Sequence, residues 1–182
     1  MVFRGTKLDG VWVIEPTRVE DDRGFFARTW CQLEFEQRRL NPRLVQCSIS
    51  YNRRKGTLRG MHFQAAPHQE AKLVRCTRGA SFNVVVDLRP ESTTFAQWFG
   101  TELTGDNHRM LYIPEGVAHG FQTLEDETEL FYQMSEVYHP ESARGVRWDD
   151  PAFAILWPLP PAIMSEKDRG FPLFQHAGVE AR

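Results

Sequence analysis

The sequence is poor in cysteine, and its three cysteines lack the spacing of a metal or redox site. Cys31, Cys47 and Cys76 are odd in number and widely separated, with no Cys-x-x-Cys pair in 182 residues. This spacing matches neither the common zinc motifs nor a thioredoxin-like couple. We therefore predict three reduced thiols, and we predict that Cys76, which lies in an alternating apolar stretch, packs in the core.

The sequence also lacks a strong excess of charge and any long apolar run. Its 22 Lys and Arg against 24 Asp and Glu give a net charge of -2, so no basic footprint for nucleic acid is present, although a local basic pocket could bind phosphate. The first ten residues, MVFRGTKLDG, carry charges from the fourth position, and no apolar run has the length of a signal peptide or a membrane span. We predict a cytoplasmic protein with no nucleic-acid or membrane partner.

Helical periodicity is scarce, and most apolar residues recur with the two-residue period of strands. Strands are predicted at residues 11–16, 24–30, 45–52, 56–64, 72–77, 81–88, 96–103, 109–114, 118–124 and 129–138. One helix is predicted at 32–40, and Arg78-Gly79 is predicted to turn a hairpin between its flanking strands. Many short strands favour an all-β fold that is closed or built of two sheets. Our preferred fold is a jelly-roll (cupin-type) β-barrel with a few short peripheral helices.

Nothing divides the chain into parts. It contains no repeat, linker or low-complexity tract, and its length suits one domain with a substantial core. We predict a single domain over residues 1–182, in which residues 176–182 form a disordered tail.

The stretch GTLRGMHFQ places an arginine and a histidine in a segment that otherwise suits a buried strand. His62 and Gln64 share one face under the two-residue period, and Tyr132 and Tyr138 share a face in theirs. Taken singly, such residues are more often core packing than functional groups. Strict alternation places Arg59 on the other face of the strand from His62, unless the strand bulges near Gly60, which glycine permits.

A second stretch, IPEGVAHGF, places His119 after a proline and a glycine, much like the second signature of the cupin barrels. Many cupins bind metal through a His-x-His pair, a carboxylate and a later histidine. Here the first pair reads His62-Phe63-Gln64, so an amide replaces an imidazole that first-row transition metals favour. We predict no metal at this set.

Taken together, the motifs resemble the dTDP-4-dehydrorhamnose 3,5-epimerase family. The matching segments, in the order and approximate spacing of the family, are DDRGFF, KGTLRGMHFQ, AKLVR, VVDLR, LYIPEGVAHGF, RGVRWDDP, WP and SEKD. The resemblance implies a jelly-roll fold and a homodimer that shares strands between subunits. It also implies that no cofactor is used, and that the reaction inverts carbons beside the keto group of a nucleotide-linked sugar.

This chemistry requires a base, an acid and a positive group, because removing a proton beside a ketone moves charge onto the keto oxygen. The resemblance implies that His62 is the base and that Asp168 orients it. Tyr132 would return a proton from the opposite face. Lys72 would lie beside the enolate oxygen, where a compact ammonium is favourable.

The resemblance also implies a binding set for the nucleotide sugar. Arg23, Arg59 and Lys167 would engage the diphosphate and sugar, since guanidinium groups match phosphate oxygens; their ordinary alternative is a surface salt bridge. Gln46 and His119 would contact the substrate, and Tyr138 would support the base. The chain departs from the family pattern at three positions of this region, where it has Arg28, Cys47-Ser48 and Ala143.

Three alternatives to a 3,5-epimerase stay open from the sequence. A relative could invert only C3 or only C5, or act on another nucleotide sugar. A catalytically silent sugar-nucleotide-binding cupin would not need the acid-base set of His62, Lys72, Tyr132 and Asp168. A metal-dependent oxygenase is the least favoured.

Overall fold

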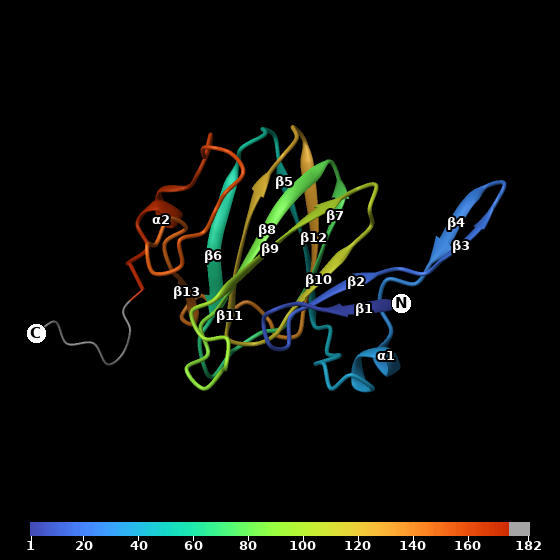
Figure 1. The fold of residues 1–182 in the computed structure, drawn as a ribbon, viewed down its shortest axis with the longest axis horizontal. Helices are drawn as coiled ribbons and strands as arrows, with labels where there is room; N and C mark the ends of the chain where they lie inside the picture. The colour runs from blue at the N-terminus through green and yellow to red at the C-terminus, as the bar shows by residue number, and fades with distance from the viewer. Residues whose placement is uncertain (175–182) are drawn as a thin grey trace, which may run out of the picture.

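The protein, described here by a computed structural model over residues 1–174, consists mainly of two facing antiparallel sheets (Figure 1). The six-stranded sheet has the order β1 (Val2–Gly5), β2 (Trp12–Glu15), β10 (Met110–Ile113), β7 (Lys72–Arg78), β12 (Thr128–Met134) and β5 (Gln46–Asn52). The five-stranded sheet has the order β13 (Ala143–Gly145), β6 (Leu58–Gln64), β11 (Val117–Thr123), β8 (Ala80–Asp87) and β9 (Trp98–Thr104). The prediction of an all-β fold is confirmed. Over the described residues the two sheets stay open, so the predicted closed barrel is not formed.

The core fills the space between the sheets. Val74, Leu111 and Leu130 come from the six-stranded sheet and pack in one buried cluster with Val85 and Phe121 from the other. Cys76 belongs to this cluster at 2% exposure, as predicted. Burial of apolar side chains from two facing sheets is the main stabilising contribution to such a fold.

The predicted hairpin at Arg78-Gly79 is wrong. β7 pairs with β10 and β12, whereas β8 pairs with β9 and β11, so the turn carries the chain from one sheet to the other. Gly79 has a positive φ of 73°, and a Cβ there would lie 2.7 Å from Oγ1 of Thr128. The alternating pattern predicted both strands correctly, but it contains no information about which strand each one pairs with.

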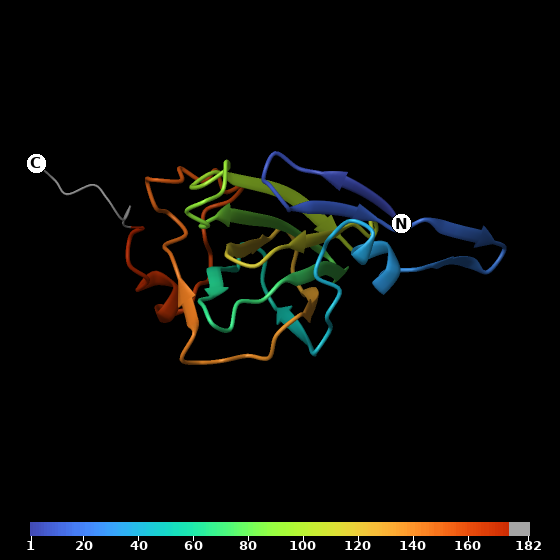
Figure 2. The ribbon, with the colours of Figure 1, turned by 90° about the horizontal axis from the view of Figure 1, so that it is seen from below.

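The predicted strands are all present, and three further strands escaped prediction. β1, β3 (Arg18–Asp21) and β13 have only three or four residues, too few for an alternating pattern to stand out. β3 pairs with β4 (Gly24–Ala27) in a separate two-stranded hairpin. Figures 1 and 2 both show this hairpin extending away from the two sheets.

Two short helices occur within residues 1–174. α1 (Gln32–Glu36) is shorter than predicted, because the chain turns back and Arg39 adopts a positive φ of 58°. α2 (Glu166–Arg169) begins after Ser165, whose hydroxyl accepts a hydrogen bond from the Asp168 N–H at 3.1 Å. Neither helix is long and apolar enough to cross a membrane. The predicted tail at 176–182 lies outside the described residues.

Candidate active site

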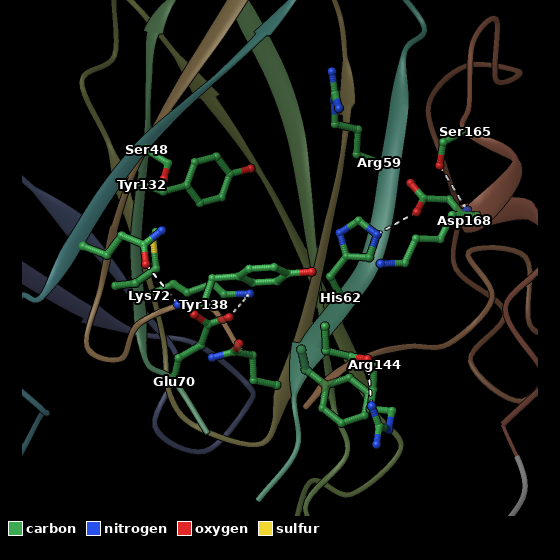
Figure 3. Close-up of a pocket in the computed structure, with 16 residues that line it drawn as sticks. Ser48, Arg59, His62, Glu70, Lys72, Tyr132, Tyr138, Arg144, Ser165 and Asp168 are labelled. Atoms are coloured by element: carbon green, nitrogen blue, oxygen red, sulfur yellow. Dashed lines mark hydrogen bonds and ion pairs between the residues drawn. The ribbon is translucent and has the colours of Figure 1, made fainter. Parts of the chain in front are cut away.

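A pocket of about 470 Å³ lies between β6 of one sheet and strands β5, β7 and β12 of the other, next to α2 (Figure 3). Nine of the twelve predicted site residues line it: Gln46, Ser48, Arg59, His62, Lys72, Tyr132, Tyr138, Lys167 and Asp168. These nine residues span 123 positions of the sequence, from Gln46 to Asp168, and the fold brings them together around one cavity.

His62 and Asp168 form a hydrogen-bonded pair. His62 Nε2 lies 2.7 Å from Asp168 Oδ1, and the carboxylate side chain is 5% exposed against 42% for the imidazole. The second carboxylate oxygen accepts from the Gly60 N–H at 3.2 Å. Burial raises the pKa of Asp168, but the bonds and charge from His62 outweigh it and leave the pKa below its ordinary value. The carboxylate is thus ionised and fixes the orientation of a solvent-accessible imidazole.

A break in β6 lets Arg59 and His62 line the same pocket. His62 pairs with His119 and Arg59 pairs with Phe121, so two residues of β6, Gly60 and Met61, lie opposite the single Gly120. Gly60 has a φ of 143°, and a Cβ there would lie 2.5 Å from Cα of Gly120. The bulge near Gly60, under which Arg59 and His62 can share a face, is present.

Tyr132 and Lys72 project from the wall opposite His62 (Figure 3). Withdrawal from water raises the pKa of the Tyr132 phenol well above its ordinary value, and the positive charge of Arg59 offsets only part of that shift. Tyr132 is therefore a protonated phenol at neutral pH, which suits a proton donor.

Lys72 is paired with an acidic residue that the sequence analysis missed. Its Nζ lies 2.9 Å from Oε1 of Glu70, and both side chains are about nine-tenths buried. The resemblance that pointed to Lys72 did not include Glu70, which lies two positions earlier and outside β7. Arg144, Ser165, Phe63 and Met134 also line the pocket without having been predicted.

His119 lies deeper than the other predicted residues. It lines a smaller cavity of about 130 Å³ together with Arg59, His62, Lys72 and Tyr132. Its Nε2 lies 3.0 Å from Oδ1 of the buried Asn83, whose amide nitrogen donates to Ser81. Burial, with the nearby Lys72 and His62, lowers the pKa of His119 well below its ordinary value, so this imidazole is neutral.

The binding candidates are held by hydrogen bonds. Arg59 Nε donates to Oδ1 of Asn52 at 2.8 Å, which orients the guanidinium group. Gln46 Oε1 accepts from the backbone N–H of Tyr138 at 2.9 Å. The Tyr138 side chain is 56% exposed at the pocket mouth.

Arg23 and Arg28 do not line the pocket of this chain. Arg23 lies in the projecting hairpin, where it pairs with Asp21 at 2.6 Å. Arg28 follows that hairpin and pairs with Glu34 at 3.4 Å. The pocket therefore contains neither of the two arginines from this part of the sequence.

The residues that suggested a cupin metal site are engaged in other contacts. Gln64 is buried, and its amide joins two backbone segments by bonding to the carbonyls of His68 and Val137 and the N–H of His139. His119 bonds to Asn83. Within residues 1–174, a group of three close ligand atoms lies instead on His68, His139 and Glu141, and His139 directly follows Tyr138, which lines the pocket.

Comparison with known proteins gives one consistent result. Residues 5–176 match the model of the dTDP-4-dehydrorhamnose 3,5-epimerase family. The chain is 46% identical to the dTDP-4-dehydrorhamnose 3,5-epimerase of Methanothermobacter thermautotrophicus, over 93% of this chain and 92% of that protein. It is 39% identical to a dTDP-4-dehydrorhamnose 3-epimerase of Streptomyces niveus, over 97% and 86%. Its structure is similar, with a TM-score of 0.91 and 40% identity over 95% and 99%, to the Bacillus anthracis 3,5-epimerase solved with TDP and PPi bound.

Proposed function

The chain belongs to the dTDP-4-dehydrorhamnose 3,5-epimerase family, and we propose that it inverts C3 and C5 of a nucleotide-linked 4-keto-6-deoxyhexose in deoxysugar biosynthesis. The observation that supports this most directly is the His62–Asp168 pair, which faces Tyr132 and Lys72 across one pocket. In keeping with the family, we assign its two-sheet architecture to the jelly-roll (cupin-type) class.

Each epimerisation requires a proton to leave one face of the sugar and a proton to arrive at the other. In our proposal His62 removes the proton from C3 or C5, and Asp168 stabilises the imidazolium that forms. Tyr132 supplies the proton from the opposite wall and is regenerated from solvent. No redox cofactor or metal is required for these steps, because electrons only shift between the carbon and the C4 oxygen.

The C4 oxygen acquires negative charge in the enolate. Lys72 is proposed to stabilise this charge. Its ammonium bonds to Glu70 at 2.9 Å, which orients the lysine side chain. The enolate would compete with Glu70 for the same N–H donors.

The nucleotide end of the substrate is proposed to lie toward the pocket mouth. Arg59 and Lys167 carry the charges for the diphosphate, Gln46 and Ser48 offer polar contacts, and Tyr138 offers an aromatic face. His119, neutral and buried, would contact the sugar from the inner cavity.

We also propose a homodimer in which the β3–β4 hairpin brings Arg23 and Arg28 to the pocket of the partner subunit. The hairpin projects from the sheets and exposes Val19 at 69% and Phe26 at 77%. Apolar side chains with this exposure favour burial against another surface. We propose a cytoplasmic location because Cys31, Cys47 and Cys76 are free thiols.

The test is incubation with dTDP-4-keto-6-deoxyglucose in deuterated water, followed by NMR. Every carbon that passes through an enolate takes up deuterium, so exchange at both C3 and C5 is expected. Exchange at C3 alone would favour the second candidate, a 3-epimerase like the Streptomyces niveus relative. Binding without exchange at either carbon would indicate a non-catalytic sugar-nucleotide-binding protein.

A further inference from the structure

Two histidines stack outside the catalytic set, and one of them, His139, directly follows Tyr138, which lines the pocket; with Glu141 we call this group the rim. The imidazole centroids of His68 and His139 lie 3.5 Å apart, with an angle of 8° between the ring planes. His139 Nδ1 lies 3.0 Å from Oε1 of Glu141, and one ligand atom from each of the three residues falls within 4.8 Å of the others. Neither the proposed reaction nor the family comparison uses these three side chains.

The histidines are held together by the buried amide of Gln64. Its Nε2 donates to the His68 carbonyl at 2.9 Å and the Val137 carbonyl at 3.1 Å. Its Oε1 accepts from the His139 N–H at 2.6 Å. Gln64 is 3% exposed, so this link does not depend on mobile surface side chains. The two chain segments are therefore joined through their backbones, independently of the imidazoles.

This donor set has the chemistry of a transition-metal site. Two imidazoles and a carboxylate suit late first-row divalent ions, and three protein ligands leave a coordination position open for water. We propose that His68, His139 and Glu141 bind such an ion, with Zn²⁺ as the probe, and that the bound ion restrains the chain segment that carries Tyr138. The proposal goes beyond the epimerase reaction and gives the metal no part in proton transfer.

The stacked rings require one movement before both can bind one ion. Imidazole lone pairs lie in the ring plane, so one ring has to turn about its Cβ–Cγ bond toward the other's nitrogen. His68 and His139 are only half-buried, and Glu141 is exposed, which leaves room for that rotation. The ion would take the place of the hydrogen bond between His139 Nδ1 and Glu141 Oε1.

The site is coupled to the pocket through adjacent residues. Tyr138 precedes His139, lines the pocket, and bonds through its backbone N–H to Gln46. Gln64 follows His62 by two positions on β6. An ion across the rim would order Tyr138 before the nucleotide arrives, and pre-ordering a contact reduces the entropic cost of binding.

The experiment is calorimetric titration of Zn²⁺ into the full chain, with Co²⁺ absorption spectra as a second measurement. We expect one site per chain. His139→Ala and His68→Ala keep the backbone atoms that Gln64 binds, and each should weaken Zn²⁺ binding by about tenfold or more. His108→Ala, whose imidazole lies next to Phe25 of the β3–β4 hairpin, serves as the control and should bind as the wild type does.

A dTDP titration with and without Zn²⁺ tests the coupling. Tighter dTDP binding in the presence of Zn²⁺ is expected for the wild type and for His108→Ala, and no change is expected for His139→Ala. Equal Zn²⁺ affinity in the wild type and both rim variants, or no binding at all, would overturn the site. Zn²⁺ binding at the rim with an unchanged dTDP affinity would overturn the coupling.

Discussion

His62 and Tyr132 are the proposed base and acid of the pocket, so their substitution should lower turnover far more than stability. The His62 side chain is 42% exposed. We expect His62→Ala and Tyr132→Phe each to lower turnover by about 10²–10⁴-fold, as general acid-base groups do. Steady-state rates, with urea unfolding as the control, separate this loss from misfolding. Near-normal turnover in either variant would remove its assigned role.

The hydrogen bond between Asp168 and His62 makes the free energy of unfolding depend on pH in the acid range. Its pKa in the folded protein lies below the ordinary value of 3.8, so the folded state binds its proton less readily than the unfolded state. The stabilisation is complete above that ordinary value and is lost as the pH falls through the lowered pKa. We expect the free energy of unfolding of wild type and Asp168→Asn to differ most near neutral pH and to converge in acid. A difference that stays constant down to acid pH would contradict the assignment.

Asn83 provides a test of buried polar pairing. Asn83→Leu leaves the buried Nε2 of His119 without its partner at 3.0 Å, and such a loss costs about 1–3 kcal/mol. Replacing His119 as well, in Asn83→Leu with His119→Phe, removes both polar groups and should recover much of that loss. Chemical unfolding of the four proteins in this cycle measures the coupling. Additive effects of the two substitutions would show that the pair is not coupled.

Single residues were predictable where a sequence pattern reflected chemistry, and less so where only the fold brings groups together. His62 and Tyr132 stood out because polar groups occupy strand positions that otherwise suit a core. Asn83 and Arg144 gave no such signal, since nothing in the sequence shows which side chains will lie beside His119 or close the pocket. Asp168 could be reached only by resemblance, because 106 residues separate it from His62.

At the level of strands, the interruption of β6 at Gly60 positions the site. At Gly60 the backbone has a positive φ of 143°, and the Cβ of an alanine there would lie 2.5 Å from Cα of Gly120, so Gly60→Ala is strained on both counts. Gly24→Ala is the matched control, because its φ is 122° and nothing lies within 4 Å of a Cβ there. Backbone strain of this kind costs about 1–3 kcal/mol. We expect Gly60→Ala to lose more stability than Gly24→Ala and also to lose turnover, since Arg59 and His62 would no longer face one pocket.

Equal unfolding midpoints for the two glycine variants would show that the close approach to Gly120 is relieved at little cost. The sequence pattern raised this interruption only as a condition, because strict alternation places Arg59 and His62 on opposite faces unless the strand bulges near Gly60. It did not predict that β7 and β8 enter different sheets, because a two-residue period specifies which face of a strand is buried and leaves its pairing partner open. β1, β3 and β13 are too short for the pattern to reveal them.

On the scale of the whole molecule, the projecting β3–β4 hairpin allows two arrangements of the site: the hairpin serves either the pocket of a partner subunit or the pocket of its own chain. If Arg23 and Arg28 serve a partner's pocket, a chain defective in the hairpin and a chain defective in His62 can complement each other. In a mixed dimer, the pocket of the His62 variant receives the defective hairpin and so carries both defects. The pocket of the hairpin variant has an intact His62 and receives an intact hairpin. Chains that use their own hairpin cannot gain anything from mixing.

We therefore expect activity to reappear when His62→Ala is unfolded and refolded together with the double variant Arg23→Ala and Arg28→Ala. With random pairing in a two-fold dimer, about a quarter of all pockets would be intact. His62→Ala refolded alone, and the double arginine variant refolded alone, provide the baselines, and sedimentation tests whether both form the proposed dimer. Because the exposed Phe26 is proposed to be buried against the partner, Phe26→Asp in the arginine variant should weaken the dimer and abolish the rescue. A mixture no more active than the mean of the two baselines would place both arginines outside the partner's pocket.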